Sequence, residues 1–479
     1  MKILLVYKDS FAQDRMAICC LSAVLKERGH QVALVIQGVT EPGKLAATMQ
    51  DFAPHVVGYS AMTGEHISLL KLNRKLKKDF RFTSVFGGAH ATFFPELIDE
   101  DGVDAICAGE GDEAFPEFCR RLENGENHWE TPSFHVKHDG KTYKNPLMAL
   151  VDVSALPFPD HKILYDADPG LAGTGNRFVM AARGCPYKCA YCFNVEYNQS
   201  YKGLGKVLRW RTPEQVIQEI EWIRDRYPTD HIAFVDDTFP AKPGKWFDEF
   251  CRLYKDRIGI PFDGTVRANS LKEDVLIQLR DAGLSFVWMG IESGDEQAAN
   301  DILGRGLSNE QIISAAAMLH RHGVGILTLN IIGLPVPDPY QTDLKTLDLN
   351  IKIKPAYAGS SILYPFPGTP IERYAREKGF LKGEPVYMET YKRSSMLDFS
   401  SPAEKRKIEN LHKLFGLIVS FPFLRPAVGF LCRLPFSGFY RAVYYLWYGY
   451  CLKMKLNPIN WRREGAYYIG LFFRMFAKS

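Results

Sequence analysis

The sequence has almost no net charge, and this absence limits its possible partners. It carries 59 Lys and Arg against 55 Asp and Glu, a formal charge of +4 over 479 residues. No block of Lys or Arg stands out in the first 400 residues, so we expect no nucleic-acid partner. The hydrophobic fraction of 46% is typical of globular proteins, and the length predicts two or three domains.

The start of the sequence is not expected to act as a secretory leader. The first apolar run, Ile3–Tyr7, is too short for a signal peptide and predicts a first buried strand. Ten cysteines without a leader indicate a reducing compartment, where spaced cysteines more often hold metal than form disulfides. We therefore expect a cytoplasmic protein.

Residues 1–130 alternate short apolar runs with helix-length amphipathic segments. This rhythm predicts parallel strands joined by crossover helices, a doubly wound Rossmann-like α/β sheet that binds ligands at the carboxyl ends of its strands. The predicted strands are Ile3–Tyr7, Val32–Ile36, Val56–Ser60, Thr83–Phe86 and Ala105–Ala108. Residues 131–170, polar and then Pro-rich, are predicted to form a linker.

The strand–helix rhythm resumes over residues 171–380 with six candidate strands. Six repeats are fewer than a closed eight-stranded barrel needs, so we expect an open, partial (β/α)6 barrel. The candidates are Arg177–Ala182, Ile232–Asp236, Asp263–Ala268, Phe286–Glu292, Gly325–Ile332 and Ser360–Tyr364.

Three cysteines follow the first barrel strand, at the end where barrels carry their reactive face. Cys185, Cys189 and Cys192 stand within eight residues on a loop that contains Gly184 and Pro186. Three thiolates can hold three corners of a four-iron cubane and leave the last iron open to a small molecule. The alternatives are a zinc loop or three buried thiols. Zinc normally takes four ligands and no fourth Cys or His stands nearby, so we favour a [4Fe-4S] cluster.

The pattern Cys-x3-Cys-x2-Cys, with an aromatic residue before the last cysteine, resembles the signature of the radical S-adenosylmethionine (SAM) superfamily. The resemblance implies that SAM binds the open iron and is cleaved by one electron to a 5′-deoxyadenosyl radical. Segments at the ends of the later strands also resemble that family, at 234–239, 264–269, 290–294, 330–335 and 364–370. The implied SAM contacts are Tyr191, Asp236, Asp237, Arg267, Glu292, Asn330 and Gly333. For Glu292, a satisfied core carboxylate is the alternative.

Three loops of the first domain resemble the cobalamin-binding domain of radical SAM enzymes that carry both cofactors. They are 58–63, 86–92 and 109–113, at the ends of the third, fourth and fifth predicted strands. The glycines leave room for a close backbone approach and the hydroxyls can bind a nucleotide tail. A purely structural sheet, or one for another ligand, is the alternative. The implied cobalamin contacts are Ser60, Met62, Thr63, Gly87, Gly88, His90, Thr92, Glu110, Gly111 and Glu113.

One departure from the best-known cobalamin motif, Asp-x-His-x-x-Gly, has a chemical consequence. The segment Lys8–Asp14 contains no histidine where a lower axial ligand would lie. We therefore predict cobalamin with its base detached and no protein imidazole on the lower face, which changes the redox behaviour of the metal.

Residues 381–479 form a predicted helical region rich in aromatic and basic residues. From Lys405 onward it has 13 Lys and Arg but only Glu409 and Glu464 as acids. No run offers about 20 apolar residues, so a membrane-spanning helix is not expected. Two compatible interpretations stay open: a helical cap on the barrel, and a segment that contacts a membrane surface peripherally.

The leading hypothesis is a cobalamin-dependent radical SAM C-methyltransferase, with no catalytic residue assigned. The resemblance implies that one SAM methylates cob(I)alamin and a second gives the deoxyadenosyl radical. The substrate radical then takes the methyl group from methylcobalamin. We expect a small-molecule substrate, a lipid or isoprenoid being one candidate class, and a reducing electron donor. The alternatives are a cyclase, a ring-contracting or oxygen-inserting enzyme with the same cofactors, and a non-catalytic cobalamin or cluster sensor.

Overall fold

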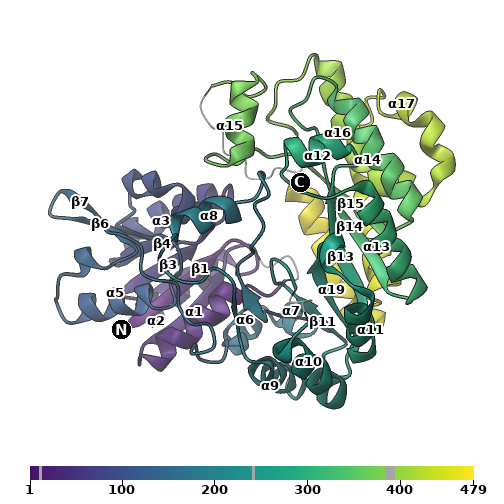
Figure 1. Cartoon of the computed structure of the whole chain (residues 1–479). Helices are drawn as coiled ribbons and strands as arrows, with labels where there is room; N and C mark the ends of the chain where they lie inside the picture. The colour runs from purple at the N-terminus through teal and green to yellow at the C-terminus, as the bar shows by residue number, and fades with distance from the viewer. Residues whose placement is uncertain (10–12, 240–242, 384–393, 479) are drawn as a thin grey trace. The chain divides into compact units, whose positions relative to one another are not determined.

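The computed structural model describes residues 1–9, 13–239, 243–383 and 394–478 (Figure 1). Part of the histidine-free segment Lys8–Asp14, and residues 384–393 of the predicted C-terminal region, lie outside the described residues. The chain divides into two compact units. The first contains Met1–Thr174 and Tyr197–Trp210, and the second contains Gly175–Glu196 and the described residues from Arg211 onward.

The first unit is built on a seven-stranded sheet in the order β2-β1-β3-β4-β5-β6-β7. The first five strands are parallel, and β6 and β7 continue the sheet as an antiparallel hairpin. Residues Ile3–Tyr7 are fully buried, as expected for a parallel strand covered on both faces. The strands are β1 (Lys2–Tyr7), β2 (Gln31–Ile36), β3 (Val56–Ser60), β4 (Thr83–Gly87), β5 (Ala105–Cys107), β6 (Phe134–His138) and β7 (Lys141–Lys144).

The crossover helices of this unit confirm the predicted doubly wound sheet. They are α1 (Met16–Glu27), α2 (Pro42–Phe52), α3 (Glu65–Asp79), α4 (Ala89–Phe93) and α5 (Ala114–Glu123).

Residues 131–170, which the sequence predicts as a linker, contain regular structure. The strands β6 and β7 turn at Asp139 and Gly140, whose φ angles are +48° and +73°. An Asp-Gly pair with positive φ at both positions suits a two-residue hairpin turn, a signal that the sequence analysis overlooked. Two short helices follow, α6 (His161–Ala167) and α7 (Pro169–Ala172), capped by the Asp160 and Asp168 side chains.

The second unit contains six parallel strands in chain order, β8-β11-β12-β13-β14-β15. This order confirms the predicted partial barrel, because each strand pairs with the next strand of the same sheet. The strands are β8 (Asn176–Val179), β11 (His231–Phe234), β12 (Phe262–Val266), β13 (Leu284–Glu292), β14 (Gly325–Ile332) and β15 (Tyr357–Ile362).

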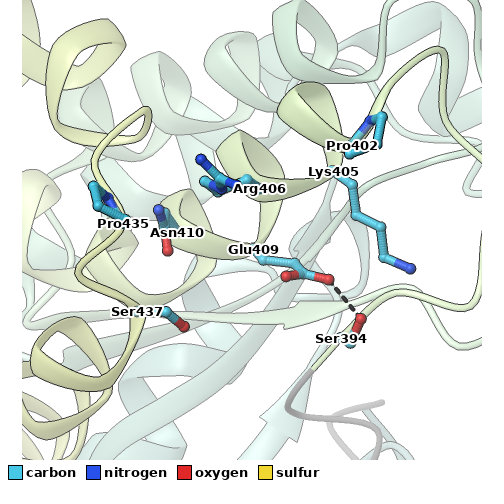
Figure 2. Close-up of a pocket in the computed structure, with 8 residues that line it drawn as sticks. All are labelled: Ser394, Pro402, Lys405, Arg406, Glu409, Asn410, Pro435 and Ser437. Carbon is cyan, nitrogen blue, oxygen red and sulfur yellow. Dashed lines mark hydrogen bonds between the residues drawn. The ribbon is translucent and has the colours of Figure 1, made fainter.

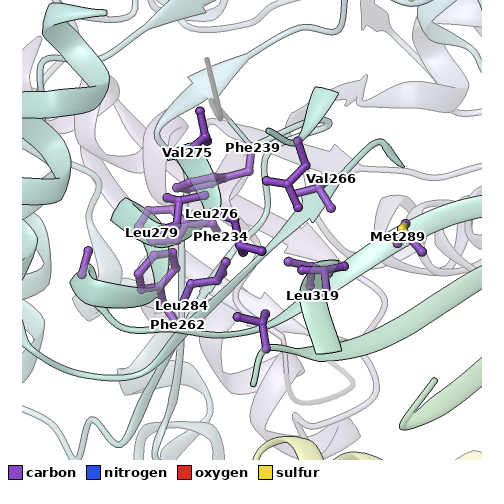
Figure 3. Close-up of a cluster of buried hydrophobic side chains, with 14 of the residues drawn as sticks. Phe234, Phe239, Phe262, Val266, Val275, Leu276, Leu279, Leu284, Met289 and Leu319 are labelled. Carbon is purple, nitrogen blue, oxygen red and sulfur yellow. The ribbon is translucent and has the colours of Figure 1, made fainter. Parts of the chain in front are cut away.

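Helices connect these strands and cover the outer face of the barrel. Capping boxes define the starts of α9, at Thr212, and of α13, at Ser308. Buried aromatic and aliphatic side chains from the strands and helices pack together, including Phe234, Phe262 and Leu279 (Figure 3). The helices are α9 (Pro213–Arg224), α10 (Lys245–Leu253), α11 (Glu273–Ala282), α12 (Glu296–Asp301), α13 (Asn309–Arg321), α14 (Pro339–Ile353) and α15 (Pro370–Glu377).

The C-terminal region is helical and packs on the last barrel strand. Leu411, Phe415 and Ile418 of α16 (Pro402–Ser420) share a buried cluster with Ile362 of β15. No helix among the described residues is both long and apolar enough to cross a membrane. The later elements are η5 (Pro422–Ala427), α17 (Val428–Leu431), α18 (Ser437–Tyr450), η6 (Cys451–Leu456) and α19 (Trp461–Lys478).

Candidate functional site

Residues from five segments meet at the carboxyl edge of the barrel, because parallel strands in chain order bring their carboxyl ends together. The cysteine loop follows β8, and Glu292 is the last residue of β13. The remaining residues that the resemblance assigns to SAM stand in or directly after the other strands: Asp236 and Asp237 after β11, Arg267 after β12, Asn330 in β14 and Gly333 after it.

The cysteine loop is fixed by backbone hydrogen bonds to two distant parts of the barrel unit. Ala190 N donates to Leu303 O at 2.9 Å, and Ile371 N donates to Ala190 O at 3.1 Å. Gly184 has a φ of +92°, a conformation that favours glycine at the entry to the loop. The loop therefore has a defined conformation before any metal is considered.

The three thiols lie in a polar but largely buried environment. Cys185 and Cys189 are buried, and Cys192 is half-buried. Thr238 Oγ1 lies 3.5 Å from Cys185 Sγ, and Asn194 N donates to Cys192 Sγ at 3.5 Å. Burial raises the pKa of Cys192 to about 11, and the charges of Cys189 and Cys185 also raise it. Metal ligation must overcome that proton affinity, as it does for thiolate ligands in general.

The donor set of this loop fits a cubane. In the part of the chain that the structure describes, no three His, Cys, Asp or Glu side chains are grouped to hold a single metal ion. A cubane makes a different demand, since each thiolate binds a different iron and hydrogen bonds to sulfur tune the cluster. Three thiols on one pinned loop, with N–H donors to the sulfurs of Cys189 and Cys192, meet that demand.

Arg305 connects the cysteine loop to the end of β13. Its Nη1 donates to Cys189 Sγ at 3.4 Å and to Tyr191 Oη at 3.2 Å, and its Nη2 donates to Gly290 O at 2.5 Å. Glu292 Oε1 lies 3.9 Å from Nη1. Arg305 Nε is buried and has no hydrogen-bond partner among the described residues. A buried donor without a partner is costly, so this nitrogen suits an anionic or carbonyl ligand.

Glu292 is held in a strained conformation at the same edge. Its φ is +68°, in the left-handed region, and the pairing of β13 with β14 shifts register between Gly290 and Glu292. Burial raises the pKa of Glu292, while Arg305 and a hydrogen bond from Tyr191 oppose that rise. Strain at a non-glycine residue clusters at functional sites, which favours a ligand-facing role over a simple core carboxylate.

Asp236 is buried against the polypeptide, whereas Asp237 is exposed. The carboxylate of Asp236 accepts hydrogen bonds from Ala182 N at 2.5 Å and Ala181 N at 3.3 Å. Burial raises the pKa of Asp236 to about 7, and these amides oppose the rise. Desolvation by nearby protein atoms also raises the pKa of Asp237, and a hydrogen bond with Asn194 opposes it. The Asp236 carboxylate thus positions the segment that precedes the cysteine loop.

Asn330 and Gly333 also have their polar groups engaged. Asn330 Nδ2 donates to Gly359 O at 2.7 Å, and its Oδ1 accepts from Asn350 Nδ2 at 2.8 Å. Gly333 N donates to the carboxylate of Asp343 at 3.0 Å. The Asn330 side chain therefore braces β14 against its neighbours.

Arg267 lies close to the cysteine loop. Its guanidinium lies 4.1 Å from the centre of the Tyr187 ring, and its Nε donates to Asn269 Oδ1 at 3.0 Å. The cation–π contact holds this buried charge beside the loop.

Sequence reasoning missed Arg305. The available signal was the pair of flanking glycines, Gly304 and Gly306, with φ angles of +65° and +56°. A Cβ on Gly304 would lie 3.2 Å from Lys188 O, so the absence of a side chain lets this segment approach the cysteine loop.

The carboxyl edge of the first sheet carries two stacked histidines. The rings of His66 and His90 lie 3.5 Å apart between centroids, and His90 Nδ1 lies 3.2 Å from Thr63 Oγ1. Burial lowers the pKa of His90 to about 3, and His66 lowers it further. Burial also lowers the pKa of His66 to about 4. Both rings are therefore neutral at physiological pH.

The neighbouring backbone leaves room for a ligand. Gly88 has a φ of +92°, and a Cβ there would lie 2.9 Å from Ala61 O, so only glycine fits. A Cβ on Gly87 would meet only Cys107 atoms, at 3.9 Å. Met62 is exposed beside Ser60, the half-buried last residue of β3. An open glycine flanked by a hydroxyl and an exposed thioether fits the approach of a large planar cofactor.

The predicted contacts in the last loop have their side chains engaged elsewhere. Glu110 forms a two-pronged ion pair with Arg209, at 2.7 and 2.8 Å, and Glu113 pairs with Arg28 at 3.1 Å. Thr92 Oγ1 accepts from Gly109 N at 2.9 Å and so ties β4 to this loop. Gly111 lies against Leu21, where a Cβ would come within 3.1 Å of a side-chain carbon.

Comparison with protein families gives two matches. A model described as the radical SAM superfamily matches residues 179–342, and a B12 binding domain model matches residues 10–119. These two ranges contain the strand edges described above, apart from the segments after residue 342.

Three curated relatives carry names that bear on function. An uncharacterized methyltransferase of Pyrococcus horikoshii is 26% identical over 451 residues, covering 90% of this chain and 94% of the relative. An anaerobic magnesium-protoporphyrin IX monomethyl ester cyclase of Rubrivivax gelatinosus is 25% identical, covering 66% and 58%. A hopanoid C-2 methylase of Rhodopseudomonas palustris is 22% identical, covering 61% and 52%.

Among solved structures, the cobalamin-dependent S-adenosylmethionine radical enzyme OxsB matches with a TM-score of 0.69. The match covers 99% of this chain and 75% of that chain at 17% identity. Similarity at this level shows a shared fold, and it confirms the predicted combination of a Rossmann-like domain with a partial barrel.

Proposed function

We propose that this chain methylates an unactivated carbon of a hydrophobic small molecule. The proposal starts from the chain's matches to the radical SAM superfamily and to a B12 binding domain. The chain is an enzyme that uses a [4Fe-4S] cluster, SAM and cobalamin. The observation that carries the proposal is the buried group at the barrel edge, where Arg305 joins Cys189, Tyr191 and Glu292. Two methyltransferases among the relatives support methyl transfer as the outcome.

In this proposal, each of the two units holds a different cofactor. Residues 1–130 would hold cobalamin at the edge formed by Ser60, Gly87 and Gly88, and residues 171–380 would hold the cluster through Cys185, Cys189 and Cys192. When bound, these groups supply reductive cleavage of SAM and carriage of a methyl group, chemistry that side chains cannot perform. Residues 131–170 would connect the two functions, and residues 381–479 would form a separate helical region.

The protein side chains would orient SAM rather than react. Arg305 has an unpaired, buried Nε and already donates to Cys189 Sγ, so it would bind the carboxylate of SAM next to the cluster. Glu292 accepts from Tyr191 and would receive the amino or ribose donors of SAM. Asp236 would act indirectly, since its carboxylate holds the backbone that precedes the cysteine loop.

The nature of the substrate and location belong to the same proposal. The hopanoid C-2 methylase among the relatives supports a lipid-like or isoprenoid substrate. A cytoplasmic location with a reducing electron donor agrees with ten cysteines that are all free thiols. Peripheral contact with a membrane would bring the enzyme to such a substrate.

A second candidate function is ring formation with the same cofactors. The cyclase from Rubrivivax gelatinosus favours it, since that relative is 25% identical over 334 residues. The motifs at the barrel edge serve either outcome, so the product decides.

The test uses anaerobically reconstituted enzyme, a reductant, lipid extract as substrate and SAM with an isotopically labelled methyl group. Methylation predicts labelled lipid with a mass gain of one methylene per turnover, together with deoxyadenosine. Deoxyadenosine with an unlabelled product that has lost hydrogen would favour the cyclase, and absence of deoxyadenosine would contradict both. The matched control is Cys185→Ala, which should form none.

A further inference from the structure

The helix α18 has apolar residues on two opposite faces. One face packs against α16, where Tyr440 joins the buried cluster of Leu411 and Phe415. The opposite face contains Phe439, Val443, Leu446 and Tyr450, spaced four, three and four residues apart along one side of the helix. Phe439 is 67% exposed and Leu446 is 61% exposed. A helix that is apolar all round is normally buried, so this second face lacks its natural surroundings.

The exposed face extends into neighbouring elements through ring contacts. Trp447 stacks on Tyr450 with ring centres 5.3 Å apart, and Phe421 lies 5.1 Å from Trp447. Phe423 lies 6.0 Å from Phe421 and is itself among the most exposed hydrophobic residues. Phe436, which precedes α18, is exposed as well. We call the following set of side chains the aromatic face: Phe421, Phe423, Phe436, Phe439, Val443, Leu446, Trp447 and Tyr450.

The segment that forms the aromatic face is rich in basic residues, although two of them pair with acids of other elements: Arg425 with Asp348 of α14, and Arg463 with Asp230. No Asp or Glu stands between Glu409 and Glu464, whereas that interval contains eight Lys and Arg. Arg433 is exposed beside Phe436, and Lys455 lies 5.3 Å from the Trp447 ring centre and 5.5 Å from that of Tyr450. A second copy of this chain would bring the same positive charge to the face, and like charges oppose such pairing.

A cationic pocket opens at the start of α18 (Figure 2). It has a volume of ≈ 420 Å³ and lies between α16 and the Pro435–Ser437 segment. Lys405 and Arg406 line it, and neither has an ion-pair partner among the described residues. The one acidic lining residue, Glu409, already accepts from Ser394 Oγ at 2.6 Å and Ser395 N at 3.2 Å. Figure 2 shows these two side chains extending in different directions from α16, so each cation is placed to contact a lipid phosphate of its own.

We propose that the aromatic face docks on the surface of a membrane that contains anionic phospholipid, with Lys405 and Arg406 each binding a headgroup phosphate. Exposed aromatic and aliphatic side chains would enter the headgroup–acyl boundary, and the surrounding cations would contact lipid phosphates. The combination of an uncharged helix face, a predominantly basic surround and an adjacent cationic pocket carries the proposal. It does not depend on the reaction, because binding to vesicles requires no turnover.

The experiment uses the full-length, reconstituted enzyme and sedimentation with vesicles of phosphatidylcholine, with and without phosphatidylglycerol. We expect at least tenfold stronger partitioning to the vesicles that contain phosphatidylglycerol, weakened by salt. Leu446→Glu should lower partitioning at least tenfold, because it places a charge in the apolar boundary. The matched control is Ile277→Glu on α11, an aliphatic residue that is also exposed, at 37%, and it should bind normally.

The headgroup contact is tested separately. Arg406→Gln and Lys405→Gln should each lower partitioning to the anionic vesicles about fivefold and leave partitioning to phosphatidylcholine unchanged. Since these side chains are at the surface, they remain informative even where Leu446→Glu disturbs the fold. Equal binding to both vesicle types, normal binding by Leu446→Glu, or loss of a dimer instead of loss of vesicle binding would overturn the proposal.

Discussion

At the carboxyl edge of the first sheet two stacked histidines are neutral, whereas at the edge of the barrel a glutamate and an arginine lie together beside the cysteine loop. His66 and His90 stack as neutral rings because burial lowers the pKa of each below the physiological range. In the barrel, Glu292 and Arg305 lie buried beside the cysteine loop. Both edges are built from parallel strands, so the difference lies in the residues that follow the strands.

The contrast teaches how one chain can serve two very different ligands. A pair of neutral rings beside an open glycine suits a large cofactor held by contact area and a few hydrogen bonds. A charged edge suits a metal cluster and a small zwitterion, because buried charges interact strongly where water is excluded. The charges at the barrel edge are costly unless they are paired, and Arg305 Nε is still unpaired.

The largest effect is expected from the loss of a cluster ligand, which should affect the barrel edge and leave the edge of the first sheet unchanged. Cys185→Ala should reduce bound iron and sulfide to background and abolish SAM cleavage, because two thiolates cannot hold the cubane. Cobalamin bound by the first unit should stay at the wild-type level. Metal analysis, the cobalamin absorbance and deoxyadenosine formation measure the three results. Cys251→Ala, a buried thiol in the barrel core, is the control and should retain iron. Full iron in Cys185→Ala would refute the assignment.

A smaller effect is expected from removal of the Arg305 charge, which connects the cysteine loop to β13. Arg305→Gln should weaken SAM binding about 10–100-fold, the effect of losing hydrogen bonds from a charged donor, while the cluster is retained. Equilibrium binding of SAM to the reconstituted enzyme, alongside iron analysis, measures it. Arg280→Gln, which removes an exposed arginine paired with Asp281, should bind SAM normally. Unchanged affinity in Arg305→Gln would remove Arg305 from the site.

The smallest effect concerns the two stacked histidines and depends on pH. The folded-state pKa of His90, about 3, and that of His66, about 4, lie below the unfolded value of 6.5. The unfolded chain therefore binds more protons, so their contribution to stability is complete above pH 6.5 and is lost as the pH falls below it. At pH 5 each histidine should lower the free energy of unfolding by about 2 kcal/mol.

Thermal melts between pH 5 and pH 7 measure this dependence. His90→Gln should show a flatter dependence than the wild type, because glutamine does not titrate. His322→Gln, at an exposed ion pair with Glu273 in the barrel unit, is the control and should keep the wild-type slope. An unchanged slope in His90→Gln would mean that the ring is protonated in the folded state.

Much of the architecture could be predicted because it depends on local patterns. Strands such as Ile3–Tyr7 and helices such as Pro213–Arg224 follow from apolar runs, periodicity and capping residues that stand close together in the chain. The cysteine loop is equally local, since its three thiols lie within eight residues. The family resemblance added the order of the remaining barrel segments.

The side-chain partners could not be predicted, because they join residues far apart in the chain. Arg305 contacts Cys189 across 116 residues, and Glu110 pairs with Arg209 across 99. The sequence likewise left open whether the C-terminal aromatics are buried or exposed, and packing on α16 buries Tyr440 while it leaves Leu446 in solvent.

The sequence by itself thus determined the parallel strands of both units and the thiols that follow β8, because covalent spacing and side-chain periodicity encode these. Only the tertiary structure decided which charges meet at the barrel edge, which predicted contacts are already paired and which face of α18 is exposed. Those outcomes depend on the packing of distant segments, and no local pattern in the chain specifies them.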